Sequence, residues 1–215
     1  MQVKRERKRF NTLVLGRRAG KTTLGQDLCC EPGVLQYPVG WFAPTYKDML
    51  EVWRAMVEVL RPIAKRVSAS DFRIENMAGG VLEFWSMDNG KAGRSRKYKR
   101  VILDECAFVP NLLDTWNAAI RPTLADYRGD AYFLSTPKGR NGFWSLWANG
   151  DNRDGWKSWQ MPSNVNPYIQ AQELADLKAD LPERKYLQEI EAQFIEDGAG
   201  IIRYVDKAVC EPIPT

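Results

Sequence analysis

A glycine-containing stretch near the N-terminus has the residue types that bind phosphate. Residues 12–23 read TLVLGRRAGKTT: a short apolar run meets a glycine loop, which leads into Lys21, Thr22 and an amphipathic stretch. A strand, a glycine loop and a helix start in this order point backbone N–H groups at an anion. We expect Lys21 to reach the outer phosphates of a nucleotide and the Thr22 hydroxyl to ligate Mg²⁺. The residues expected to line the nucleotide are Gly16, Arg17, Arg18, Ala19, Gly20, Lys21, Thr22 and Thr23.

The spacing of this loop departs from the standard pattern G-x-x-x-x-G-K-[ST]. Counted back from Gly20, the first glycine belongs at Leu15, whereas Gly16 comes one residue later and two arginines lie inside the loop. The alternative is a surface turn rich in glycine and lysine, which would not need a buried strand in front of it. The strand before the loop and the helix after it favour phosphate binding.

Two adjacent acids follow a second apolar run. Residues 101–105 read VILDE, which predicts a buried strand that ends in Asp104 and Glu105. Ligands of parallel sheets bind outside the carboxyl ends of the strands. We expect Asp104 to hold Mg²⁺ through its water shell and Glu105 to orient and polarise an attacking water. By themselves these acids could equally cap a strand exit, but together with the glycine loop they indicate nucleotide hydrolysis.

Two further segments lie close to this chemistry. Residues 131–134 predict another buried strand, and Ser135, Thr136 and Pro137 follow it. Hydroxyls beside a γ-phosphate can sense hydrolysis and pass it on as a backbone shift, although a plain capping role is the alternative. The second segment, residues 91–100, carries six basic side chains and runs directly into the strand of Asp104: Lys91, Arg94, Arg96, Lys97, Lys99 and Arg100.

Alternating helical and strand patterns place these motifs in an α/β fold with a mostly parallel sheet. Expected strands cover 12–15, 39–43, 72–75, 81–85, 101–105, 131–134 and 156–160, and expected helices cover 21–30, 47–66, 112–121 and 142–148. From residue 163 the chain becomes polar, with one helix expected at 169–180 and a second from Pro182 to about 195. We therefore expect an ATPase-like core at 1–162, a small helical lid at 163–197 and a linker at 198–215. Tyr46, at the entrance of the helix at 47–66, is expected to pack there or to stack on a base.

Composition limits the chemistry. The chain has 215 residues, 44% of them hydrophobic, and a formal charge of +4, so the distribution of charge matters more than its total. It contains no histidine, which excludes histidine triads, histidine zinc ligands and histidine bases. Its four cysteines form no C-x-x-C pair, which favours a reduced, cytoplasmic setting. No apolar run reaches the ~18 residues of a membrane span. The basic run at 3–9 is either a solvated leader or a phosphate contact.

The motifs taken together resemble the N-terminal ATPase domain of the large terminase subunit of tailed double-stranded DNA bacteriophages. No single motif is specific, but the order and spacing of five of them are, and they cover almost the whole chain. These are GRRAGKTT at 16–23, APTY at 43–46, GRS at 93–95, STP at 135–137 and NPYI…YLQEIEAQF at 166–194. Even the displaced glycine fits, since this family often carries a deviant loop with an arginine inside it.

The resemblance implies an ASCE-type P-loop ATPase that uses ATP and Mg²⁺ to move double-stranded DNA into a procapsid. By motif, Thr22 and Asp104 hold the metal, Glu105 is catalytic and Thr136 lies in the coupling motif. Arg17 or Arg18 would act within the subunit, and Arg94 matches an arginine finger supplied to a neighbouring subunit. Implied partners are the portal protein, the small terminase subunit and further copies in a ring, usually of five, although an isolated domain can be monomeric. The implied location is the cytoplasm of the infected bacterium.

Several alternatives remain beside this interpretation. Large terminases also carry a nuclease domain, and because this chain ends about where that domain begins, we do not expect it to cleave DNA. A P-loop kinase would keep Lys21 and Thr22 but needs an acceptor pocket. Another translocase or a helicase, and a scaffold that binds nucleotide without turnover, are the remaining hypotheses. We expect contacts with the DNA backbone that are blind to sequence. The candidates for those contacts are Lys97, Lys99, Arg100 and Lys138.

Overall fold

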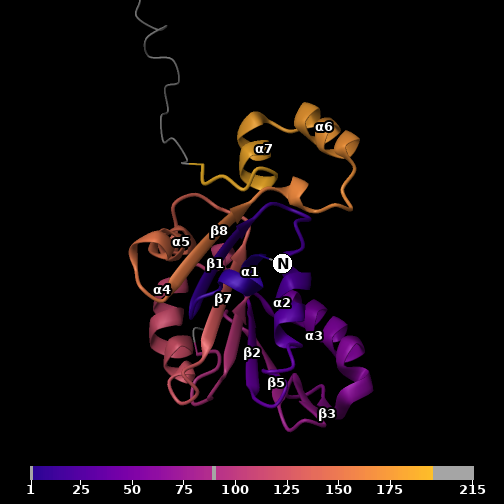
Figure 1. Ribbon diagram of the computed structural model, residues 1–215, viewed down its shortest axis with the longest axis vertical. Helices are drawn as coiled ribbons and strands as arrows, with labels where there is room; N and C mark the ends of the chain where they lie inside the picture. The colour runs from indigo at the N-terminus through magenta and orange to yellow at the C-terminus, as the bar shows by residue number, and fades with distance from the viewer. Residues whose placement is uncertain (1, 89–90, 196–215) are drawn as a thin grey trace, which may run out of the picture.

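An eight-stranded sheet forms the centre of the protein. The computed structural model describes residues 2–88 and 91–195 (Figure 1). The strands follow the order β3-β4-β5-β2-β6-β7-β1-β8 across the sheet. Their bounds are β1 Phe10–Leu15, β2 Pro38–Ala43, β3 Ala64–Ser68, β4 Arg73–Asn76, β5 Val81–Ser86, β6 Arg100–Leu103, β7 Asp130–Ser135 and β8 Trp156–Met161.

The six strands from β5 to β8 in the sheet order pair in parallel, and only β3 and β4 add antiparallel pairs at one edge. The carboxyl ends of β1, β2, β6 and β7 therefore lie at the same edge of the sheet. This confirms the expected α/β fold with a mostly parallel sheet. It also brings the segments after these strands together, although they are far apart in the sequence.

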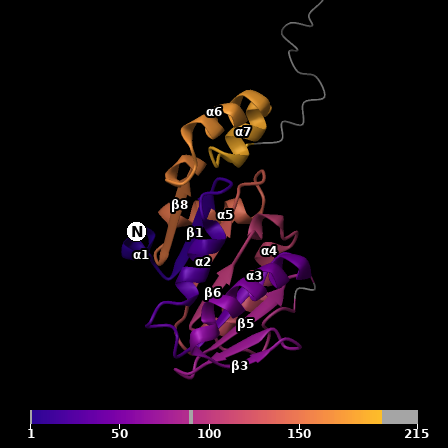
Figure 2. The same ribbon diagram turned by 90° about the vertical axis from the view of Figure 1, so that its right-hand side faces the viewer.

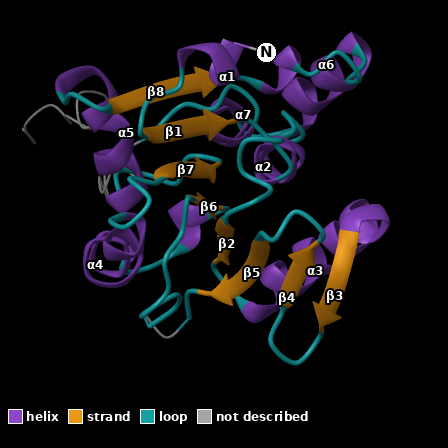
Figure 3. Ribbon diagram, turned by 60° about the horizontal axis from the view of Figure 1, so that its bottom comes forward, coloured by secondary structure: helices purple, strands orange, loops and turns teal. Residues whose placement is uncertain are grey.

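Helices cover both faces of the sheet, as Figure 3 shows, with α2 and α3 on one face and α4 and α5 on the other. The helices are α1 Gln2–Glu6, α2 Lys21–Cys29, α3 Tyr46–Leu60, α4 Leu112–Thr115, α5 Gly142–Asn152, α6 Ala171–Asp180 and α7 Glu183–Glu189. A π-helical segment, Trp116–Ile120, continues α4, and short 3₁₀ segments cover 61–63, 106–108, 121–124 and 163–165.

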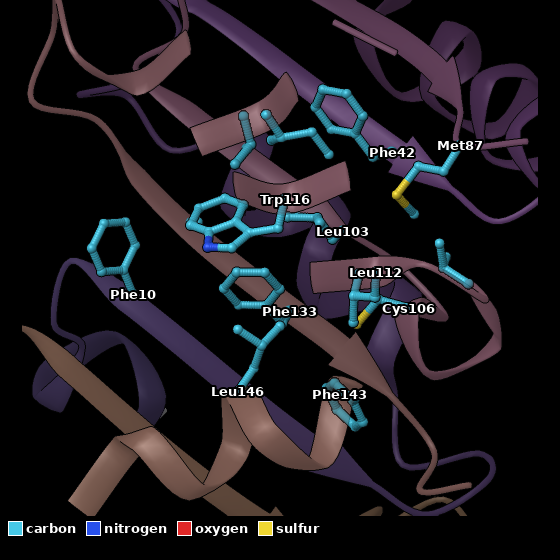
Figure 4. Close-up of a cluster of buried hydrophobic side chains, with 14 of the residues drawn as sticks. Phe10, Phe42, Met87, Leu103, Cys106, Leu112, Trp116, Phe133, Phe143 and Leu146 are labelled. Atoms are coloured by element: carbon cyan, nitrogen blue, oxygen red, sulfur yellow. The ribbon is translucent and has the colours of Figure 1, made fainter. Parts of the chain in front are cut away.

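Alternate strand residues supply the two halves of the core. Leu13 and Ile102 pack under α2 and α3, whereas their neighbours Val14 and Leu103 pack under α4 and α5. This alternation follows from the pleat of a strand that is covered on both faces. On the α4 and α5 side, Trp116 lies 5.7 Å from Phe10 and 4.8 Å from Phe133, measured between ring centroids (Figure 4).

The helices α6 and α7 stand apart from the sheet, beyond the end where β1 and β8 lie and opposite the β3 edge, as Figure 2 shows. Neither helix has a residue that is fully buried. This is the helical pair expected from Ser163 onward. No helix in the described part of the chain is both long and apolar enough to span a bilayer.

Two helix ends differ from expectation. The helix expected at 47–66 ends at Leu60, and a strand, β3, begins at Ala64. Pro62 explains the early end, because proline lacks the N–H that a continued helix requires. The second lid helix ends at Glu189 rather than near 195, and Ile190 and Ala192 after it are buried. The expected linker at 198–215 lies outside the described residues.

The basic run at 3–9 is not a free leader. It overlaps the short helix α1, and two of its cations, Lys4 and Arg7, pair with acids at the end of α2 and just after it. The Lys4 ammonium lies 2.6 Å from Asp27, and the Arg7 guanidinium lies 2.6 Å from Glu31. These pairs hold the N-terminus against the core.

Candidate phosphate-binding site

The loop between β1 and α2 has the backbone geometry of an anion site. Arg18 and Gly20 have φ angles of 62° and 88°, and α2 begins immediately afterwards at Lys21. The first N–H groups of a helix have no partner inside the helix, so those at the start of α2 are available to an anion in front of it. Gly20 suits its position because a side chain is strained at this φ angle. Ala19 lies within the loop, and Thr23 is exposed in the first turn of α2.

Gly16 is required by a close approach rather than by its φ angle. A Cβ atom at this position would lie 2.4 Å from Ser163 Oγ and 2.5 Å from the Ile190 carbonyl oxygen. The segments before and after the lid helices therefore pass directly against the loop. Two hydrogen bonds join the segment before the lid helices to the loop. Ser163 Oγ donates to the Arg17 carbonyl and Asn166 Nδ2 donates to the Arg18 carbonyl, each at 2.6 Å.

The start of α2 meets the end of β6 through two side-chain pairs. Thr22 Oγ1 donates to Asp104 Oδ2 at 3.2 Å, and Lys21 Nζ lies 3.5 Å from Glu105 Oε1. Asp104 is only 4% exposed. Burial, and after it the negative charge of Glu105, raises the pKa of Asp104 to about 7. A cation bound beside Asp104 would offset both causes, so the threonine hydroxyl and this carboxylate fit a Mg²⁺ ion.

Glu105 is held in an unusual backbone conformation. Its φ angle of 48° lies in the left-handed region, which costs a non-glycine residue of order 1–3 kcal/mol. Ser135 at the end of β7 supports it: Ser135 Oγ donates to Glu105 Oε2 at 3.3 Å and accepts from the Ala107 N–H at 3.2 Å. The segment expected to sense hydrolysis thus touches the expected catalytic carboxylate directly.

A cavity of about 590 Å³ opens over these groups. Five of the residues expected from the sequence line it, namely Arg17, Arg18, Lys21, Glu105 and Thr136. Four residues that the sequence analysis did not assign to the site complete the lining: Pro44, Thr45, Asp48 and Phe108. Thr45 and Asp48 carried a usable signal, because T-x-x-D before an apolar run is a capping pattern and Thr45 does cap α3.

The two loop arginines differ in their surroundings. The Arg17 Nε donates to Glu189 Oε2 at 2.6 Å, and the Arg17 N–H donates to the Glu189 carbonyl at 2.7 Å. Arg17 is therefore tied to the lid. The Arg18 side chain forms no hydrogen bond or ion pair with the residues that the structure describes, and it borders the same cavity. Arg18 is the arginine of the pair whose guanidinium is available for a ligand.

Arg94 does not join this cluster within one molecule. It is exposed and lines a separate cavity of about 520 Å³ with Asp88 and Asp114. Tyr46, expected either to pack at a helix entrance or to stack on a base, is half exposed, with its ring 5.5 Å from that of Phe72 in an edge contact. That contact matches the packed aromatic expected at a helix entrance.

Arg100 is not available to DNA, which corrects one expectation. Its side chain is 3% exposed and donates to Asp130 through two nitrogens, at 2.7 Å and 2.6 Å. Lys97 lies 2.8 Å from Asp126, and Lys99 donates to the Tyr127 carbonyl at 3.3 Å. Lys138 lies 4.8 Å from the centre of the Phe108 ring, beside the phosphate cavity.

No group of three or more acidic, cysteine or histidine side chains is close enough to hold a metal among residues 2–88 and 91–195. A Mg²⁺ ion at Thr22 and Asp104 would therefore complete its oxygen ligands from phosphate and water, which is the usual arrangement for this ion.

The family model for the terminase large subunit, T4likevirus-type, N-terminal part, matches residues 12–206. The terminase large subunit of Escherichia phage T5 is 29% identical over 197 residues, which are 87% of this chain and 44% of that protein. The terminase large subunit of Thermus virus P23-45 is 29% identical over 173 residues, which cover 70% of this chain and 32% of that protein. The chain spans less than half the length of these relatives.

Solved structures show the same fold. The large terminase ATPase domain of Thermus phage P74-26 has a TM-score of 0.76 at 23% identity and covers 90% of this chain and 92% of its own. The large terminase of the thermophilic bacteriophage D6E, solved in complex with ATP-gamma-S, has a TM-score of 0.69 at 14% identity, over 87% of this chain and 48% of its own.

Proposed function

Because this chain belongs to the family of terminase large subunits, we propose that it is the ATP-hydrolysing part of a motor that drives double-stranded DNA into a procapsid. One observation carries the proposal: Lys21 and Thr22 at the start of α2 contact Glu105 and Asp104 just after β6, and Lys21 and Glu105 line a single cavity. A phosphate-binding loop opposite two carboxylates is the arrangement that nucleotide hydrolysis requires.

Each group has a definite part in in-line attack of water on the γ-phosphate. Lys21 and the N–H groups at the start of α2 bind the phosphates, and Glu105 orients the water. Mg²⁺ held by Thr22 and Asp104 would neutralise charge on the phosphate oxygens. Ser135 keeps the Glu105 carboxylate aimed at the cavity, since it donates to Oε2 and leaves Oε1 beside Lys21.

The helical lid would bind the base and ribose. We divide the chain into a core at 1–162 and a lid at 163–197, with a linker after it. A cavity of about 700 Å³ separates the lid from the loop, with Arg17 and Arg18 on one side. The lid contributes to its lining both charged residues, Glu173, Lys185 and Glu189, and the apolar residues Ile169, Leu174, Leu177, Leu181 and Ile190. A partly apolar slot that adjoins the phosphate cavity suits the flat face of a base.

Two substitutions test this base site. Leu177→Asp places a charge in the slot, so we expect the Kd for ATP and for ADP to rise by about 10-fold, or about 1.4 kcal/mol. Val59→Asp is the matched control, since Val59 is an exposed residue of α3 that lines neither cavity. Equal nucleotide affinity in the two variants, measured by titration with a fluorescent analogue, would place the base elsewhere.

The proposed partners are double-stranded DNA, bound through its backbone, the portal protein, the small terminase subunit and further copies of the chain in a ring. The proposed location is the cytoplasm of an infected bacterium. Among the basic residues considered for DNA, the exposed side chains of Lys97 and Lys138 remain candidates.

The substitution Glu105→Gln tests hydrolysis itself. We expect ATP turnover to fall by at least about 10²-fold, because the water loses its orienting carboxylate, while ATP affinity is retained. Glu51→Gln, an exposed position on α3, is the control. Equal turnover in the two variants would support a scaffold without catalysis. A kinase would consume ATP only when an acceptor is added, and a helicase would separate strands in a displacement assay.

A further inference from the structure

The basic run at 91–100 contains one arginine that has no partner among the described residues. Four cations of the run are engaged: Arg96 lies 3.6 Å from Glu83, Lys97 pairs with Asp126, Lys99 donates to the Tyr127 carbonyl, and Arg100 pairs with Glu31 and Asp130. In contrast, the Arg94 side chain is exposed and forms no hydrogen bond or ion pair within residues 2–88 and 91–195. The loop therefore presents the Arg94 guanidinium outward.

Buried residues anchor this loop on both sides of Arg94. Before it, Ala92 is buried and Gly93 has a φ angle of 73°, and a Cβ atom on Gly93 would lie 2.8 Å from the Phe42 ring. After it, Tyr98 is 0% exposed and packs edge-on against the same ring at 6.1 Å. Both ends of the loop are thus fixed to β2.

A hydrogen-bonded cluster locks the second anchor. The Tyr98 hydroxyl donates to Glu83 Oε2 at 2.6 Å and accepts from Trp85 Nε1 at 2.8 Å. Glu83 is 5% exposed and also accepts from Arg73 at 3.1 Å. Burial, and then the charge of Glu83, raises the pKa of Tyr98 well above its usual value, so its hydroxyl stays a donor.

Arg96 links this cluster to the turn that carries Arg94. Its Nε lies 3.6 Å from Glu83 Oε2, and its guanidinium lies 5.6 Å from the centre of the Trp85 ring. The Arg96 N–H donates to the Gly93 carbonyl at 3.2 Å, which closes the turn around Arg94 and Ser95. Two side chains of β5, Glu83 and Trp85, therefore define where the Arg94 backbone lies.

We propose that Tyr98 and Glu83 are positioning residues that hold this turn rigid, so that Arg94 is presented to the phosphate cavity of a neighbouring copy. The inference rests on the proposed function, and on the expectation from the sequence resemblance that Arg94 acts as an arginine finger between subunits. Within one molecule Arg94 borders a different cavity from Lys21 and Glu105, and its exposed side chain is open to contact with a neighbouring copy. A pre-ordered loop avoids the entropic cost of ordering the side chains that assembly would otherwise immobilise.

The substitution Tyr98→Phe removes only the hydroxyl and tests the proposal. Turnover is measured in the assembled state, reached by raising the protein concentration or by adding the portal. We expect turnover per subunit to fall about 10–100-fold, because a misplacement of about 1 Å can cost 10²-fold. ATP affinity should stay within about twofold of the wild type, because the nucleotide-binding residues lie elsewhere. Tyr127→Phe, at a half-buried tyrosine outside the loop, is the control and should leave turnover unchanged.

Mixed assemblies separate a positioning role from a general structural defect. Glu105→Gln copies cannot hydrolyse ATP but carry an intact Arg94 loop, whereas Tyr98→Phe copies have an intact site of their own. We expect Glu105→Gln copies to raise the turnover of their Tyr98→Phe neighbours. A defect within the Tyr98→Phe copy would not be rescued, and absence of rescue would overturn the inference.

A second variant covers the case in which Tyr98→Phe folds poorly. Arg96→Met removes the contact with Glu83 and the stacking on Trp85 at a half-exposed side chain, and the same loss and rescue are expected. If Arg94→Ala lowers assembled turnover but Tyr98→Phe and Arg96→Met do not, the positioning role is wrong and the proposed function stands. If Arg94→Ala itself has no effect in the assembled state, the action of Arg94 between subunits is wrong.

Discussion

Two glycines in the phosphate loop serve different physical purposes. Gly20 adopts a φ angle of 88° with open space around it, so the backbone conformation selects glycine there. Gly16 lies where the lid segments at Ser163 and Ile190 press against the loop. The glycine that is displaced from the standard loop pattern is therefore needed for the contact with the lid.

This distinction predicts the effect of Gly16→Ala. The added methyl group would overlap the Ile190 carbonyl, which is backbone and cannot swing away, so we expect a loss of about 1–3 kcal/mol in the free energy of unfolding. Urea denaturation measures this loss. Gly33→Ala is the matched control, because a Cβ atom there meets nothing within 4 Å. Equal stability of the two variants would show that the lid does not press on the loop.

Charged groups at the two ends of strand β6 have different roles, one in the candidate site and one in a buried ion-pair cluster. Its carboxyl end leads into Asp104 and Glu105 in the candidate site, whereas its first residue, Arg100, is buried among Asp130, Glu31 and the Leu28 carbonyl. This cluster joins β6 and β7 to the end of α2. The elements that carry the loop and the acids are thereby fixed to one another at the edge opposite the site.

The substitution Arg100→Met should therefore act on stability. It leaves Glu31 and Asp130 without their main partner, and breaking a buried ion pair costs about 3–5 kcal/mol. Lys97→Met is the control, since its pair with Asp126 is exposed and such pairs contribute little to stability. Denaturant unfolding compares the two. If Arg100→Met lost DNA binding without losing stability, Arg100 would be a DNA contact rather than a stabilising buried residue.

The same cluster predicts how stability depends on pH. Burial by itself would raise the pKa of Glu31, but hydrogen bonds from Arg100 and Arg7 outweigh it and lower the pKa below its usual value. A lowered folded-state pKa contributes stability that is present above the unfolded value, about 4.3, and is lost as the pH falls through the folded value. We expect the melting temperature to fall below about pH 4, and Glu31→Gln to reduce that fall. Parallel curves for the two proteins from about pH 3 to about pH 7 would refute this role of Glu31.

At the scale of the whole molecule, the proposed function divides the charged groups for catalysis between copies. The phosphate loop, the acids and Ser135 converge in one chain, but Arg94 lies on another cavity. Hydrolysis that needs a neighbour's arginine depends on assembly, and an arginine finger is worth roughly 10³–10⁵ in rate.

This division predicts that turnover per subunit rises with protein concentration. We expect Arg94→Ala to abolish the rise while ATP affinity is unchanged, because Arg94 is absent from the lining of its own phosphate cavity. Steady-state ATP hydrolysis over a concentration series, for wild type and Arg94→Ala side by side, measures the effect. A flat rate for the wild type, even after the portal is added, would contradict a site shared between copies.

The sequence by itself determined the fold class and most of the candidate site. Apolar runs followed by phosphate-binding or acidic residues predict parallel strands, and the ends of parallel strands must meet at one edge. That rule alone is enough to bring Lys21, Thr22, Asp104, Glu105 and Thr136 together. Local patterns also predicted the helical pair after residue 163, although Pro62 ended one helix at Leu60 and the last helix ended at Glu189.

Only the tertiary structure decided which cations are free. Arg17 pairs with Glu189, which lies 172 residues away in the sequence, and Arg100 pairs with Asp130, which lies 30 residues away. No local sequence pattern therefore distinguishes these two paired arginines from Arg18 and Arg94. The reason for Gly16 likewise lies in a segment that is remote along the chain. Residue type and spacing specify what a side chain can do, whereas packing between distant segments determines which side chains remain available to do it.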